Sequence, residues 1–114
     1  MTYKGKELNT MGEVFDKALQ LAKENKNEAL EFFNEYIEHI LKNNDEVNTY
    51  DEAEKIAKVN FGYFAGYYNK EVCDIIYKTY QCSHPIFGDN PFSADPKEAF
   101  KIGYNIGKNS KHNN

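Results

Sequence analysis

Apolar residues recur every three or four positions along most of the chain, which is the spacing of one buried face on an α-helix. The first such stretch follows Thr10, which forms a capping-box pattern with Glu13, and it extends to about Ala22. A second stretch covers about 28–42, and the short polar turn between the two predicts an antiparallel helical hairpin. Residues 1–9 are polar, and we expect them to form an extended lead-in.

A third and a fourth helix are predicted in the middle of the chain. Thr49 and Glu52 repeat the capping-box pattern and begin the third helix, and Asn69 is placed to cap the short fourth helix. The positions of the third helix that we expect to face inward are Ala53, Ile56, Ala57, Asn60, Phe64, Tyr67 and Tyr68.

The segment 81–94 has no helical pattern and holds Ile86, Phe87 and Phe92. Side chains this apolar favour an ordered loop, and long loops that are ordered are often functional. We therefore expect this loop to pack against the third and fifth helices.

Asp95, Pro96 and Glu98 form a clear helix start for a fifth helix. Residues 109–114 are polar and are expected to form a disordered tail. No strand-like alternation is evident. The sequence thus predicts an all-α, single compact domain of about five helices over residues 10–108, with the long ordered loop before the last helix.

Two pairs of glycines stand at helical spacing, Gly62 with Gly66 and Gly103 with Gly107. Each glycine costs a helix interior about 1 kcal/mol relative to alanine, so a close approach of another backbone or a ligand must offset that cost. We interpret the pairs as the faces at which the third and fifth helices cross. A contact between subunits and a ligand-approach surface are the alternatives.

Five aromatic rings also lie within residues 60–68, and they cover nearly every side of the third helix. A two-layer bundle cannot bury all of them. We predict core positions for Phe64 and Tyr67, and interface or pocket positions for Tyr63 and Tyr68.

Two polar residues, Asn60 and His39, lie among apolar positions. A buried amide needs a partner, and we predict a structural hydrogen bond from Asn60 to the loop after the fourth helix, with a ligand contact as the alternative. We interpret His39 as a surface or helix-end histidine whose protonated form is favoured by the helix dipole.

Composition narrows the functional classes. The 114 residues carry a formal net charge of −4, and every basic residue is a lysine, which argues against binding of duplex nucleic acid. No stretch is long and apolar enough to span a bilayer, and the N-terminus lacks the apolar core of a signal peptide, so we expect a cytoplasmic protein. In that compartment Cys73 and Cys82 are expected to be free thiols.

Catalysis ranks low among the hypotheses. Cys82 and His84, with Asp74 as an orienting group, suggest a small hydrolase, but they are too close in sequence for the usual assembled pair. Three scattered histidines form no metal cluster. We predict no catalytic residue, no metal and no cofactor.

Several strings resemble a group of small bacteriophage and prophage proteins of unsettled function. They are Asn60-Phe61-Gly62-Tyr63-Phe64-Ala65-Gly66-Tyr67-Tyr68, His84-Pro85-Ile86-Phe87-Gly88, Glu98-Ala99-Phe100 with Gly103, and Glu52-Ala53-Glu54-Lys55-Ile56-Ala57. The resemblance covers about residues 10–108. It implies a protein that acts by binding, as an antagonist of host defence or of a host enzyme, in the cytoplasm of an infected or lysogenic bacterium.

Our functional hypothesis is non-catalytic binding of a nucleotide-like host signalling molecule. In it the rings stack a base, Asn60 reads a base edge, and His84 with Lys58 contacts phosphate. The alternative is a protein-binding inhibitor or a homo-oligomeric module with Tyr63 and Tyr68 as anchors. The predicted ligand-binding residues are Asn60, Tyr63, Tyr67, His84, Phe87 and Lys58, and the predicted interface residues are Gly62, Gly66, Tyr68, Gly103 and Gly107.

Overall fold

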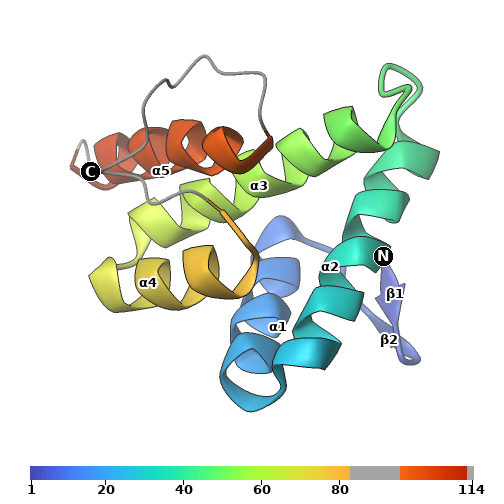
Figure 1. Cartoon of the computed structure of the whole chain (residues 1–114), viewed down its shortest axis with the longest axis horizontal. Helices are drawn as coiled ribbons and strands as arrows, with labels where there is room; N and C mark the ends of the chain where they lie inside the picture. Colours follow the sequence, from blue (N-terminus) through green and yellow to red (C-terminus); the bar gives the residue numbers. More distant parts are fainter. Residues whose placement is uncertain (83–95, 113–114) are drawn as a thin grey trace.

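The computed structural model describes residues 1–82 and 96–112, which form five helices and one small hairpin (Figure 1). This confirms the predicted mostly helical single domain. The elements are β1 (Thr2–Tyr3), β2 (Lys6–Glu7), α1 (Met11–Glu24), α2 (Lys26–Asn43), α3 (Tyr50–Tyr67), α4 (Lys70–Thr79) and α5 (Pro96–His112).

Four of the helices begin at a side-chain cap. The side-chain oxygens of Thr10, Asn25, Thr49 and Asn69 each accept the backbone N–H three residues further on, at 3.0–3.2 Å. Three of these caps were predicted. Asn25 is the difference, because it ends α1 and caps α2 at once, so the turn between them is a single residue and α2 starts earlier than predicted.

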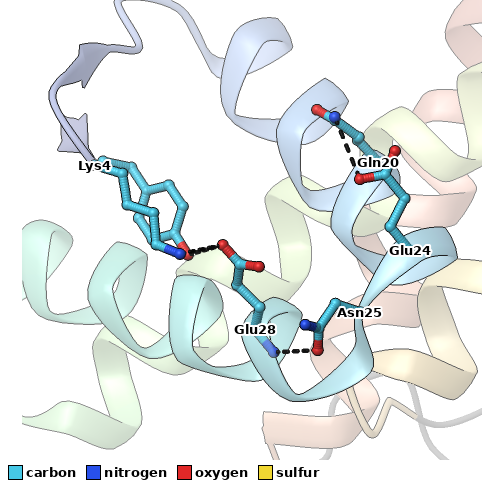
Figure 2. A network of polar contacts seen from close by, with 6 residues as sticks. Lys4, Gln20, Glu24, Asn25 and Glu28 are labelled. Carbon is cyan, nitrogen blue, oxygen red and sulfur yellow. Dashed lines mark hydrogen bonds and ion pairs between the residues drawn. The ribbon is translucent and has the colours of Figure 1, made fainter.

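The predicted lead-in is extended, but it pairs with itself as the β1–β2 hairpin, which was not predicted. Lys4 and Gly5 occupy the turn with φ of 49° and 81°, as tight hairpin turns require. Tyr3 packs edge-on against Phe32 of α2 at 4.8 Å between ring centroids. Lys4 Nζ and the Tyr3 hydroxyl both contact Glu28 Oε1, so the hairpin is tied to the start of α2 (Figure 2).

The core is built around the ring of Phe61 on α3. Its centroid lies 5.7 Å from that of Phe15, 5.0 Å from that of Phe33, 5.6 Å from that of Tyr36 and 5.3 Å from that of Tyr80. These rings come from α1, α2 and the end of α4, so one side chain of α3 connects four helices.

The buried face of α3 agrees with the prediction at Ala53 and Ala57, but it is rotated relative to the prediction from Phe61 onward. Phe61 and Ala65 are buried, whereas Tyr67, predicted to be a core residue, is 39 % exposed. Phe64 is partly buried against the core, and Tyr68 is 40 % exposed. The prediction for Tyr67 was wrong because aromatic residues lie on every side of this part of α3. Their spacing therefore does not identify which face is buried.

The glycine pairs join α3 to α5, which lie side by side (Figure 1). A Cβ at Gly62 would collide with the Phe100 carbonyl oxygen, and one at Gly66 with that of Tyr104. Moving four residues along α3, from Gly62 to Gly66, moves the contact four residues along α5, from Phe100 to Tyr104, so the two helices run parallel. The interpretation of a tight contact between these helices is confirmed.

The contact is reciprocal within the chain, since a Cβ at Gly103 would collide with the Val59 carbonyl oxygen and one at Gly107 with that of Tyr63. Each glycine face is covered by a helix of the same chain. The contact at Gly62, Gly66, Gly103 and Gly107 is thus between helices of one chain, as preferred over the alternative of a contact between subunits.

The last helix extends further than the sequence pattern indicated. α5 continues to His112, and the Ser110 hydroxyl donates to the Ile106 carbonyl oxygen at 2.9 Å. The predicted tail over 109–114 is thus helical as far as it is described. The predicted ordered loop lies outside the described residues from position 83 onward, as do His84 and Phe87.

Candidate ligand-binding groove

A groove of about 320 Å³ opens between the start of α1, the second half of α2 and the middle of α3. Its walls include Met11, Ile40 and Ile56, and its polar groups include Tyr36, His39 and Asn60. Three other hollows are smaller, at about 210, 170 and 180 Å³.

Asn60 is held in the groove by a side-chain network across three helices. Its Nδ2 donates to the Tyr36 hydroxyl at 3.1 Å, and that hydroxyl donates to Met11 Sδ at 3.2 Å. Tyr36 is itself fixed by stacking on Phe61, with 11° between the ring planes, and burial raises its pKa. The predicted structural bond of Asn60 exists, but its partner is on α2.

This arrangement uses the donor of the Asn60 amide and leaves its Oδ1 without a side-chain partner among the described residues. Asn60 is half-buried, and its Oδ1 remains available to accept a hydrogen bond from a ligand.

His39 supplies a hydrogen-bond donor, whereas Asn60 supplies an acceptor. Asn43 Nδ2 lies 3.2 Å from His39 Nδ1 and donates to the His39 carbonyl oxygen at 2.9 Å. With the amide nitrogen donating to Nδ1, the ring hydrogen sits on Nε2, which is a donor. Burial lowers the pKa of His39. The predicted preference for the protonated form is wrong, because desolvation and repulsion by the Met1 ammonium together outweigh the helix-end dipole.

The lining side chains of the groove are uncharged, and the charge at its edge is the N-terminal ammonium of Met1, which donates to the Leu8 carbonyl oxygen at 2.9 Å. None of its lining side chains within the described residues is a lysine, aspartate or glutamate. The C-terminal end of α2 also reaches the groove at Asn43, and the dipole there disfavours an anion. The site therefore suits an uncharged group with a hydrogen-bonding edge.

The structure does not bring the predicted ligand-binding residues together. Lys58 lies on another side of α3, buried and paired with Glu54 at 2.9 Å. Tyr63 and Tyr67 stack on each other at 6.4 Å and line no part of the groove. Of the six predicted residues, only Asn60 lies in it, and His84 and Phe87 lie outside the described residues.

Sequence reasoning missed Met11, Tyr36 and the role of His39 in this groove. The signal that was present is Asn60, an amide at a position where the helical pattern asks for an apolar side chain. It lies in the groove, but its partner is set by tertiary packing.

The two cysteines offer no activated nucleophile. Burial raises the pKa of Cys73 to about 11 and that of Cys82 to about 12, so both thiols are protonated at neutral pH. Both are free thiols. Among residues 1–82 and 96–112, no three His, Cys, Asp or Glu side chains are grouped to hold a metal ion.

Comparison with protein-family models, with curated proteins and with solved structures gives no match. None of the helices described is long and apolar enough to cross a membrane. The functional argument therefore rests on the geometry of the groove.

Proposed function

We propose that this protein acts by binding, and that the groove receives the uncharged heteroaromatic end of a small nucleotide-like molecule. The observation that carries the proposal is the Asn60 amide, anchored through Nδ2 to Tyr36 while its Oδ1 is left to accept. A preorganised acceptor of this kind fits the donor edge of a nucleobase.

The remaining groove supports the same ligand class. His39 Nε2–H provides a donor, and the flat ring of a base would lie against the apolar walls of Met11, Ile40 and Ile56. Sites of this kind are mostly apolar, with a few polar groups that fix orientation.

Phosphate groups would extend out of the groove into solvent, because the lining side chains are uncharged and the Met1 ammonium already donates to the Leu8 carbonyl oxygen. The groove would then recognise the nucleoside part of the ligand. Together with the resemblance to small phage proteins, this supports sequestration of a host signalling nucleotide that counters host defence.

The test is a thermal-shift and calorimetric titration with adenosine, guanosine, cytidine and uridine and with their monophosphates. A ligand at about 100 times its Kd stabilises the folded state by about 2.7 kcal/mol. We expect one nucleoside to bind, with its monophosphate binding no more tightly. Asn60→Leu should abolish binding, whereas Asn105→Leu, at an exposed position of α5, should not.

The proposal fails if no nucleoside raises the melting temperature, or if Asn60→Leu binds as the parent protein does. Retained unfolding cooperativity shows that the Asn60 variant is folded.

Docking of a protein partner is a second candidate, favoured by exposed apolar side chains near the ends of α3 and α5. Tyr67, Tyr68 and Ile106 are 39 %, 40 % and 50 % exposed. Light scattering across a concentration series tests self-association, and a melting temperature that rises with protein concentration alone would favour this function over nucleoside binding.

A further inference from the structure

A second hollow, of about 210 Å³, lies on a different side of α3. It is formed by α2, by the first half of α3 and by the residues that end α4. Lys58 faces this hollow and Asn60 faces the groove, as expected for residues two apart on a helix, whose side chains diverge by roughly 200°.

Lys58 is unusual in this position, because it is only 4 % exposed. Its ammonium group has three donors, and its only polar partner among the described residues is Glu54 Oε2 at 2.9 Å. Buried donors that lack acceptors are costly, and lysine is rarely buried unless it is paired. The hollow beside it gives an acceptor room to bind.

The charges select the class of ligand. A simple anion would be attracted by Lys58 but repelled by Glu54. A simple cation would be attracted by Glu54 but repelled by Lys58. A ligand that carries both charges satisfies both residues, because charge-assisted hydrogen bonds form to each end. Glu54 Oε1 has no partner among the described residues and is available to accept.

The floor of the hollow indicates what else the ligand carries. Leu30 of α2 is half-buried and contributes apolar surface, while Phe33 and Ile37 beside it are 5 % and 1 % exposed. On the rim, the Tyr50 hydroxyl donates to Asn34 Oδ1 at 2.8 Å, which leaves the Asn34 Nδ2 donors for a carboxylate.

We propose that this hollow binds a small aliphatic α-amino acid, with its carboxylate on Lys58, its ammonium on Glu54 and its side chain against Leu30 and the edge of Phe33. The site is separate from the groove and does not depend on the nucleoside proposal.

The test is an NMR titration of the ¹⁵N-labelled protein with four probes: L-leucine, glycine, 4-methylpentanoate, which lacks the amino group, and 3-methylbutylamine, which lacks the carboxylate. We expect saturable shifts around Lys58 and Gln81 with L-leucine. Each of the other three probes should bind at least about tenfold more weakly, which corresponds to about 1.4 kcal/mol.

Two substitutions assign the charges. Lys58→Met keeps an apolar stem and should abolish L-leucine binding, whereas Lys55→Met, on the same helix but outside the hollow, should leave it unchanged. Glu54→Gln should reverse the preference, so that 4-methylpentanoate binds more tightly than L-leucine. This variant keeps the test decisive if Lys58→Met does not fold.

The proposal is overturned if L-leucine gives no saturable shifts, if 4-methylpentanoate binds the parent protein as tightly as L-leucine, or if Glu54→Gln leaves the order of the probes unchanged.

Discussion

Substituting Gly103 by alanine tests the contact between α3 and α5 most directly. In an ordinary helix interior this change stabilises the protein by up to about 1 kcal/mol. Here the new Cβ would overlap the Val59 carbonyl oxygen and lie 2.8 Å from Tyr63 N, whereas ordinary contacts begin at 3.4 Å. The atoms it meets are backbone and cannot rotate away, so the two helices must separate.

The magnitude follows from that separation. A gap of half an ångström or more already forfeits about a quarter of the dispersion energy of the atoms facing it. The fully buried Phe100 lies in the same contact. Overpacking of this kind costs about 3 kcal/mol at its upper end, and the helix-propensity gain offsets about 1 kcal/mol of it. We expect a net loss of about 2 kcal/mol.

Urea unfolding followed by circular dichroism measures this loss as a lower midpoint at an unchanged slope. Gly12→Ala is the matched control, because the only atom near its Cβ is Thr10 Oγ1 at 3.8 Å, and it should be neutral or stabilising. If Gly103→Ala is as stable as the parent protein, the parallel glycine contact described here is incorrect.

Four further predictions follow from the core, the caps and the titratable groups. Phe61→Ala should cost about 3–5 kcal/mol in urea unfolding, because the ring is 1 % exposed. Thr49→Ala should cost about 1 kcal/mol through the lost cap of α3, and Thr49→Ser should restore most of it. Because the pKa of His39 is lowered from 6.5 in the folded state, stability should fall as pH drops below about 6.5, and His39→Gln should reduce that slope between pH 7 and 5. Cys73 and Cys82 should react slowly with a thiol reagent at pH 7.5 and rapidly in urea; fast reaction of the folded protein would contradict their raised pKa values.

Local features of the fold could be predicted from the sequence because their physics is local. The caps at Thr10, Thr49 and Asn69 need only a side-chain oxygen three residues before a free N–H. The glycine contact was predictable for a different reason: Gly62 and Gly66 are costly in a helix unless a backbone approaches, so their presence implies a partner.

The groove could not be assembled in the same way. Which side of α3 faces the core depends on whether Phe61 or Tyr67 is buried. Because aromatic residues lie on all sides of the helix, their spacing does not predict which of the two it is. Asn60 signals a hydrogen bond but not that Tyr36 accepts it, since the two residues are joined only by the packing of α2 on α3. The burial of Lys58 is likewise a property of its neighbours.

The parallel contact between α3 and α5 has a consequence for biosynthesis. Gly62 leaves the ribosome long before Phe100, so the matching face of α3 must wait for α5, the last of the described helices to be made. An uncovered surface of leucines would promote aggregation, whereas a glycine face exposes main chain and little apolar side-chain surface. The contact face of α3 that stays uncovered until α5 is made therefore favours little non-native association.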